Sequence, residues 1–174
     1  RDVVRALMRS DKYDVKILSQ RWGNTPYGFL NEDNPEEKKM KDAIVPPQLQ
    51  RQPDVWIQIS VPDEFQKLGK FNIGITAGIE TDLCDVRFIQ GANKMDLLLG
   101  SSNHSLHALK NSQYEQKDKA GQVVGIIKLE TPTDILFEGV DLEKYFLIEP
   151  KDLPKTELVQ SLDTIKENFS FLYV

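Results

Sequence analysis

The chain has 174 residues, of which 40% are hydrophobic and 28% are charged, which is enough apolar material for one buried core. Its formal net charge of -5 argues against nucleic acid and against an anionic membrane as main partners, because both require a dense basic surface. No apolar run is long enough to span a bilayer. The single cysteine, Cys84, excludes an internal disulfide and fits a reducing compartment, so we expect a cytoplasmic protein.

The first third of the chain begins with an amphipathic helical pattern. Residues 1–10 place four apolar side chains on one face at helical spacing: Val3, Val4, Leu7 and Met8. A strand is predicted over 13–18, followed by a long polar loop from 21 to about 35. A short helix over 36–43 should then end at the tandem prolines 46 and 47, because proline cannot continue a helix.

Short apolar strands and helices alternate through the middle of the chain. Strands are predicted over 55–59, 71–77, 95–99 and 133–137. Helical patterns cover 84–95 and the residues after 101–103, where Ser101, Ser102 or Asn103 can cap the N-terminus of the helix. The first two strands are nearly continuous apolar runs, typical of parallel strands covered on both faces. Residues 119–122 predict the turn of a hairpin that leads into 123–127. This alternation predicts an α/β layered fold with a largely parallel sheet.

The last part of the chain is predicted to contain a linker, a helix and a strand. The linker covers 150–154, where two prolines lie close together, and the helix covers 157–168. The β-rich run 169–174 is predicted to be a strand.

Five segments, taken in chain order, match the pattern of one enzyme family. They are Pro53–Ile59 with Pro62, Lys70–Asp82, Asn93–Ser102, Phe137–Phe146 and Phe169–Val174. Together they resemble the acceptor-side half of GT-B type glycosyltransferases, and the resemblance covers nearly the whole chain. Each motif is weak by itself, and the order and spacing of all five carry the likeness. Two departures are Gly100, where the family prefers proline, and Glu138, where it prefers asparagine.

The resemblance implies a Rossmann-like three-layer domain with a mostly parallel sheet over 1–148, whose first strand would precede Arg1. Residues 149–174 would be the linker, helix and first strand of a truncated donor domain. The absent first strand would be central in the sheet and would leave its neighbours with unpaired backbone groups. The run 169–174 is one candidate to fill that position.

The resemblance also implies a function. The intact protein would transfer a sugar from a nucleotide-sugar donor to a hydroxyl of a carbohydrate or glycan acceptor, with retention of anomeric configuration as the commoner outcome in this branch. No metal or other cofactor is implied beyond the nucleotide-sugar co-substrate. The groups that hold the donor would follow Val174, so we expect the chain to be inactive alone.

Glu80, Thr81 and Asp82 follow a predicted buried strand, and ligands of open α/β sheets bind beyond the carboxyl ends of strands. A carboxylate at Glu80 could orient an acceptor hydroxyl or take its proton as a base. For Thr81 and Asp82 the simpler interpretation is that one of them caps the helix that follows.

Other candidate substrate contacts are Ser102, His104, Trp22 and Gly139. Ser102 and His104 stand at a strand-to-helix junction, where a helix N-terminus can hold an anion, although a plain N-cap is the simpler interpretation. His107 follows at a spacing that could bind a metal, but no nearby cysteine completes a zinc site. Trp22 lies in the long loop and could stack on a sugar or pack on its own domain. Gly139 is expected to adopt a positive φ, with a structural role favoured.

One alternative belongs to another class of protein. A non-catalytic α/β module that recognises a carbohydrate or a protein would need the same strands and no donor site. Sugar transfer by the intact protein would distinguish the two hypotheses.

Overall fold

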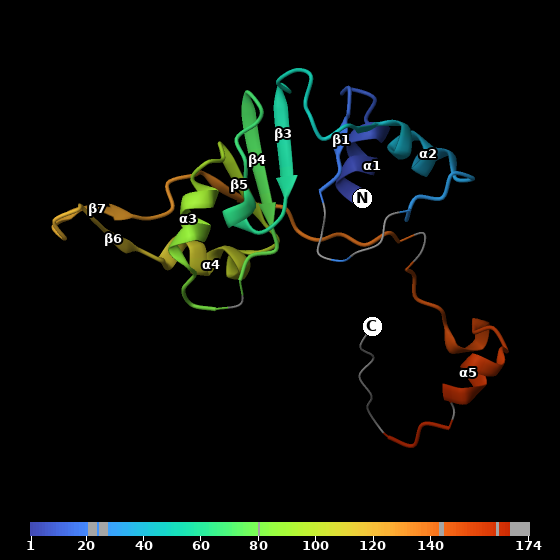
Figure 1. Cartoon of the computed structure of the whole chain (residues 1–174). Helices are drawn as coiled ribbons and strands as arrows, with labels where there is room; N and C mark the ends of the chain where they lie inside the picture. The colour runs from blue at the N-terminus through green and yellow to red at the C-terminus, as the bar shows by residue number, and fades with distance from the viewer. Residues whose placement is uncertain (21–23, 25–27, 80, 143–144, 163, 168–174) are drawn as a thin grey trace. The chain divides into compact units, whose positions relative to one another are not determined.

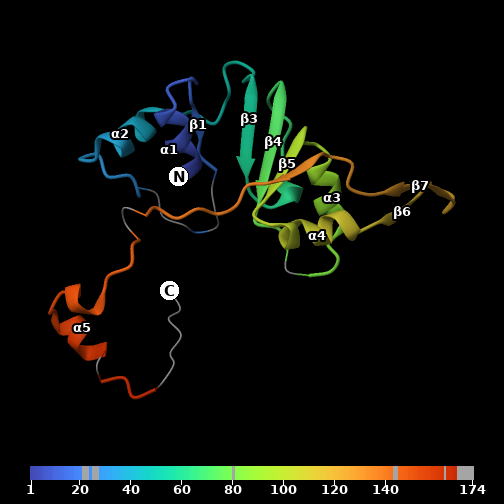
Figure 2. The ribbon, with the colours of Figure 1, turned by 180° about the vertical axis from the view of Figure 1, so that it is seen from behind.

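The computed structural model describes residues 1–20, 24, 28–79, 81–142, 145–162 and 164–167. Figures 1 and 2 show the chain from opposite sides. It divides into two compact units, Arg1–Leu136 and Phe137–Val174. None of the helices in the described residues combines the length and apolar composition that a bilayer crossing needs.

The first unit opens with two helices. Helix α1 spans Asp2–Arg9 and α2 spans Pro35–Asp42, so both predicted helices are confirmed to within a residue or so. The Asn34 side chain caps α2 by accepting hydrogen bonds from the first-turn amides, and Pro35 fits the first helical position because it needs no N–H partner there. Helix α2 ends at Asp42, ahead of the tandem prolines that were expected to end it.

Two short strands lie beside these helices in the chain. The strand predicted over 13–18 is reduced to β1, Ile17–Leu18, which pairs in parallel with β2, Ile44–Val45. The sequence analysis did not predict β2. It occupies the two residues before Pro46, where an extended backbone is favoured because the proline ring disfavours the helical conformation.

The main sheet contains four parallel strands in the order β3-β4-β5-β8. They are β3 Val55–Ile59, β4 Phe71–Thr76, β5 Leu97–Gly100 and β8 Thr133–Ile135. Ile57 lies opposite Ile73, which lies opposite Leu97, and Leu98 lies opposite Thr133. The predicted α/β fold with a largely parallel sheet is therefore confirmed.

One face of this sheet carries the hydrophobic core. Helix α3 spans Val86–Ala92, α4 spans Asn103–Asn111, and the 3-10 turn η1 spans Pro62–Glu64. The core joins Leu98 of the sheet to Ile89 of α3 and to two leucines of α4, Leu106 and Leu109, all fully buried. Both connecting helices therefore cover the same face.

Two strand glycines allow this close packing. A Cβ atom at Gly74 would lie 2.6 Å from the Phe65 ring, and one at Gly100 would lie 2.6 Å from Leu106. Ordinary carbon contacts are about 3.5–4.0 Å, so a side chain at either position would force the helical layer away from the sheet.

The opposite face of the sheet is mostly apolar and only partly buried. Its apolar side chains, assigned by strand register, are Val55, Ile57, Ile59, Phe71, Ile73, Ile75, Leu97 and Leu99, and Asp134 of β8 lies beside Leu99 on the same face. None of them belongs to the core cluster, and Val55 is 51% exposed, Ile59 50% and Phe71 45%. The prediction that these strands are covered on both faces is therefore wrong for the described residues, because α3 and α4 lie on one side only.

A β-hairpin is inserted between α4 and β8. Strand β6, Tyr114–Lys117, pairs antiparallel with β7, Val123–Ile127, as the turn signal predicted. The Asp118 carboxylate accepts hydrogen bonds from the amides of Ala120 and Gln122, and Gly121 supplies a φ of +81°. In Figures 1 and 2 the hairpin projects from the α3–α4 layer, away from the four-stranded sheet.

The described residues of the second unit contain little regular structure. They include a 3-10 turn, η2, at Pro150–Asp152 and helix α5 at Glu157–Leu162. The helix predicted over 157–168 is thus shorter than expected. The strand predicted over 169–174 lies outside the described residues.

Candidate functional site

The site predicted from the sequence lies where β4 and β5 end. Their last residues, Thr76 and Gly100, are register partners, so the loops that follow leave the sheet side by side. The Ser101 hydroxyl donates to the carbonyl oxygen of Ala77 over 3.4 Å, and the Gly78 amide donates to the Thr76 hydroxyl over 3.3 Å. The first bond joins the two loops and the second lies within the loop after β4, both at the carboxyl edge, where ligands of open α/β sheets bind.

Gly78 brings the loop after β4 onto the first turn of α4. Its φ is +85°, and a Cβ atom there would lie 2.2 Å from the Ser105 carbonyl oxygen. The loop and the helix therefore touch backbone to backbone, which only glycine permits. Gly78 was not among the site residues expected from the sequence, although a glycine two positions after an apolar strand is a recognisable signal.

Ser102 is the N-cap of α4, as predicted. Its hydroxyl oxygen accepts the Ser105 amide over 3.1 Å, and the Ser105 hydroxyl oxygen accepts the Ser102 amide over 3.0 Å. This reciprocal pair is a capping box built from two serines. Because the cap uses Ser102 as an acceptor, its hydroxyl hydrogen is the part that a ligand could still engage.

Both histidines of α4 are exposed. His104 lies in the first turn beside the candidate edge, and the His107 ring lies 2.7 Å from the Asn111 side-chain amide one turn further on. In the part of the chain that the structure describes, no three His, Cys, Asp or Glu side chains are placed to hold a metal ion together.

Thr81 and Asp82 lie exposed in the loop after β4, and the Thr81 hydroxyl donates to the Leu83 carbonyl oxygen over 2.7 Å. The prediction that one of them caps the next helix is wrong. Helix α3 begins at Val86, and the Asp85 carboxylate caps it by accepting the Arg87 amide over 2.8 Å. The hydrogen bond from the Arg87 side chain, with that amide bond, lowers the pKa of Asp85.

The physical reason for the later start is the position of Cys84. Its amide donates to the Ser112 hydroxyl over 2.8 Å, and its carbonyl oxygen accepts the Tyr114 hydroxyl. Both backbone groups are thus bonded to residues beyond α4, and Asp85, which follows, has an extended backbone (φ -62°, ψ 145°), so the helix begins after it. The predicted helical pattern, which began at residue 84, gave no sign of these long-range bonds.

The remaining predicted residues lie elsewhere. Glu80 and Trp22 are outside the described residues. Gly139 belongs to the second unit, and the positive φ expected for it is wrong, since that conformation occurs at Gly28, Gly78 and Gly121. A Cβ atom at Gly139 would meet nothing within 4 Å, so neither a left-handed turn nor close packing requires glycine there.

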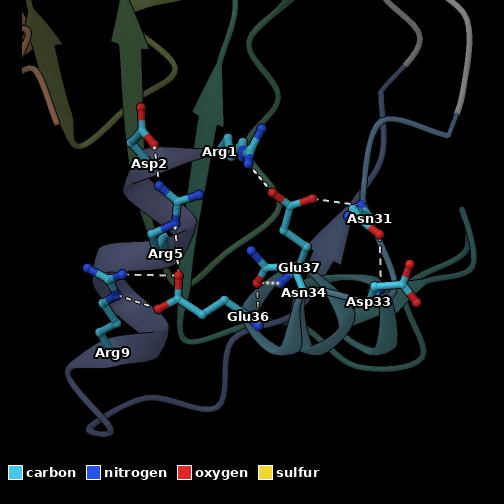
Figure 3. Close-up of polar contacts among 9 residues, drawn as sticks. All are labelled: Arg1, Asp2, Arg5, Arg9, Asn31, Asp33, Asn34, Glu36 and Glu37. Atoms are coloured by element: carbon cyan, nitrogen blue, oxygen red, sulfur yellow. Dashed lines mark hydrogen bonds and ion pairs between the residues drawn. The ribbon is translucent and has the colours of Figure 1, made fainter. Parts of the chain in front are cut away.

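A polar cluster that the sequence analysis missed joins α1 to α2 (Figure 3). Arg5 and Arg9 lie one turn apart and both face Glu36. Arg9 donates to both carboxylate oxygens, over 2.6 and 3.0 Å. The buried Nε of Arg5 lies 3.4 Å from the same carboxylate without forming a hydrogen bond, so its contribution is electrostatic.

The second carboxylate of this cluster is Glu37, which is buried. It contacts the Arg1 guanidinium and accepts the Asn31 amide over 2.7 Å. The sequence signal is the four-residue spacing of the three arginines, which places them on one helix face opposite the carboxylates of α2. These pairs hold the two helices together.

Hollows among the described residues are lined by residues other than those at the ends of β4 and β5. One, of about 70 Å³, lies between α1 and α2 and is lined by Arg5, Met8, Arg9, Glu36, Lys39 and Met40. The other is wider and more polar, and η1 and Lys94 contribute to its lining. The carboxyl edge itself is an open surface, with Thr81, Asp82 and His104 exposed along it.

Comparison of the chain with family models, with curated proteins and with solved structures found no match.

Proposed function

We propose that this chain is the acceptor-side part of a GT-B type glycosyltransferase, which in its intact form transfers a sugar from a nucleotide sugar to an acceptor hydroxyl. The observation that carries the proposal is the sheet itself. Three of the segments that resemble the family contribute β3, β4 and β5, which are adjacent parallel strands with β8 next to them in the sheet, and polar loops follow β4 and β5. Ligands of such sheets bind outside the carboxyl ends of the strands.

In this proposal the carboxyl edge is the acceptor wall of the cleft. Glu80, which stands between Ile79 and Thr81 in the sequence, is the carboxylate assigned to orient or deprotonate the attacking hydroxyl. The hydroxyl hydrogen of Ser102 and the side chains of Asp82 and His104 contribute hydrogen bonds to acceptor hydroxyls. Since the edge is open, a second wall is needed to exclude water during transfer.

The proposal includes a strand beside β3 and a helical layer over the open face of the sheet. Parallel sheets are almost always covered on both faces. The half-exposed Val55 and Ile59 on the outermost strand β3, together with the apolar residues beside them, support this part of the proposal.

The second candidate is a module that binds a glycan without catalysis. The observation that favours it is the openness of the edge, because an exposed row of hydroxyl, carboxylate and imidazole groups can recognise sugar hydroxyls without enclosing them. The two candidates share the same residues and differ in whether a sugar is transferred.

The test uses the full-length protein with UDP-, GDP- and ADP-sugars. We expect one donor to raise the melting temperature and to support transfer to a glycan acceptor. Glu80→Gln should lower the transfer rate by about a hundredfold while leaving the donor-induced shift unchanged. Glu130→Gln is the matched control, because that carboxylate is exposed and lies far from the carboxyl edge in the chain. The absence of both a melting-temperature shift and sugar transfer with every donor would refute the enzyme hypothesis. Glycan binding without transfer would support the non-catalytic module.

A further inference from the structure

The β6–β7 hairpin is firmly anchored at its base. The Tyr114 hydroxyl donates to the Cys84 carbonyl oxygen, and Ile127 packs against the core. The Asn93 side chain bonds the segment that follows the hairpin, donating to the Lys128 carbonyl over 2.8 Å and accepting the Glu130 amide over 2.9 Å. The base of the hairpin is therefore fixed to the core, which lowers the entropy cost of binding a partner at the hairpin.

The two strands of the hairpin carry different side chains. Strand β6 exposes Glu115, Gln116 and Lys117, and the two charged residues form an ion pair of 3.2 Å. Strand β7 exposes three aliphatic side chains: Val123 is 53% exposed, Val124 60% and Ile126 51%. Charged side chains protect an edge strand from pairing, whereas an uncharged β-branched edge invites it. Of the two edges, that of β7 is the one suited to a partner.

Lysines mark both ends of this edge. Lys119 stands in the turn, Lys128 follows the last residue of β7, and no charged residue lies between Gln122 and Ile127. Both lysines are exposed, and among the described residues no carboxylate lies within ion-pair distance of either. A complementary strand therefore has acidic ends and an apolar, β-branched middle.

A second copy of the chain is a poor match for the same edge. Antiparallel pairing of two β7 strands about Gly125 would bring Lys128 of one copy close to the turn with Lys119 of the other, and like charges would repel. Three aliphatic side chains also fall short of the roughly 800 Å² per partner that a stable dimer buries.

We propose that β7 accepts an extended strand of a partner protein by β-augmentation, and that this strand is β-branched in its middle and acidic at both ends. Main-chain hydrogen bonds along the free edge of β7 provide the attachment, and the exposed aliphatic side chains and the two lysines select the sequence.

The test is fluorescence anisotropy with a labelled peptide that alternates Val and Thr in its middle and carries two Glu at each end. We expect saturable binding, weakened about tenfold when the Glu residues are replaced by Lys in the peptide. The double variant Val124→Lys, Ile126→Lys should also weaken binding by about tenfold or more. Gln116→Lys, on the β6 edge of the same hairpin, is the matched control and should leave binding unchanged.

A second variant keeps the test decisive if the double variant unfolds. Lys128→Glu alters only an exposed side chain and should reduce the preference for the acidic peptide. Equal binding of both peptides, binding that survives the β7 substitutions in a folded protein, or no binding up to about 1 mM would overturn the proposal. Sedimentation showing a dimer that Ile126→Lys dissociates would also overturn it, in favour of a second copy as the occupant.

Discussion

Gly78 brings the loop after β4 directly against Ser105 in the first turn of α4. We predict that Gly78→Ala lowers the free energy of unfolding by about 2–4 kcal/mol, because it combines a left-handed φ with a clash against the Ser105 carbonyl. Urea denaturation measures this loss.

Gly121 provides a matched control for that substitution. Its φ of +81° is nearly the same, but nothing lies within 4 Å of an added Cβ atom. Gly121→Ala should therefore cost only about 1–2 kcal/mol, from the left-handed backbone alone. Equal losses for the two variants would show that the loop after β4 does not rest on α4.

Ser102 is a candidate contact for the acceptor that already has a structural role as the N-cap of α4. Ser102→Ala removes the acceptor of the capping box, and we predict a loss of about 1 kcal/mol of stability. Ser101→Ala, which removes only one long hydrogen bond of 3.4 Å, should cost less. If Ser102 also contacts the acceptor, its variant should raise the KM for the glycan in the full-length protein, a change that cap loss alone does not produce. An unchanged KM would restrict Ser102 to capping.

At the residue scale, helix caps that depend on neighbouring residues could be predicted from the sequence. Hydrogen bonds from residues far along the chain could not. The cap at Ser102 follows from a serine placed between an apolar strand and a helical pattern. The cap of α3 was misplaced because the bonds that hold Cys84 outside the helix come from Ser112 and Tyr114, more than 25 residues later in the chain. Spacing along the sequence carries no information about such partners.

The α1–α2 pair is held by ion pairs and is therefore sensitive to acid. The hydrogen bond from Arg9 lowers the pKa of Glu36 from its ordinary value of 4.5, with smaller contributions from the charges of Arg9, Arg5 and Lys39. A pKa that is lower in the folded than in the unfolded state gives stability that is present above the unfolded value and is lost as pH falls through the folded one.

We therefore predict that contact between α1 and α2 weakens as pH falls below about 4.5, its loss completing below the folded pKa of Glu36. The measurement is the NMR shift of the Arg9 Nε–H group as the pH is lowered. In Glu36→Gln the acid-dependent change of this resonance should disappear, whereas Glu130→Gln should retain it. A titration that is the same in both variants would assign the acid transition to another group.

At the element scale, the apolar composition of the strands correctly predicted where they lie in the chain. It did not predict which of their faces would be buried. The runs at 55–59 and 71–77 correctly indicated strands of a parallel sheet. The same runs suggested burial on both faces, and only the face of Gly74 and Leu98 is buried. Apolar composition reports what a strand can bury, whereas the direction of the chain crossovers decides which face the helices cover.

The whole sheet has one packed face and one open face, and the difference can be measured. We predict that Ile59→Lys changes the stability of the 174-residue chain by less than about 0.5 kcal/mol, because Ile59 is 50% exposed on the outermost strand. Leu98→Ala, at a fully buried position on the packed face, should cost about 2–5 kcal/mol in the same chain.

The same pair of variants in the full-length protein tests the third layer of the proposed glycosyltransferase. If further strands and helices cover this face, Ile59→Lys would bury an unpaired charge and should destabilise the full-length protein by about 3 kcal/mol or more. Leu98→Ala should cost the same in both proteins, because its surroundings are complete within this chain. An Ile59→Lys variant that is neutral in both would mean that the apolar face stays open, which would contradict the three-layer fold and weaken the case for a GT-B enzyme.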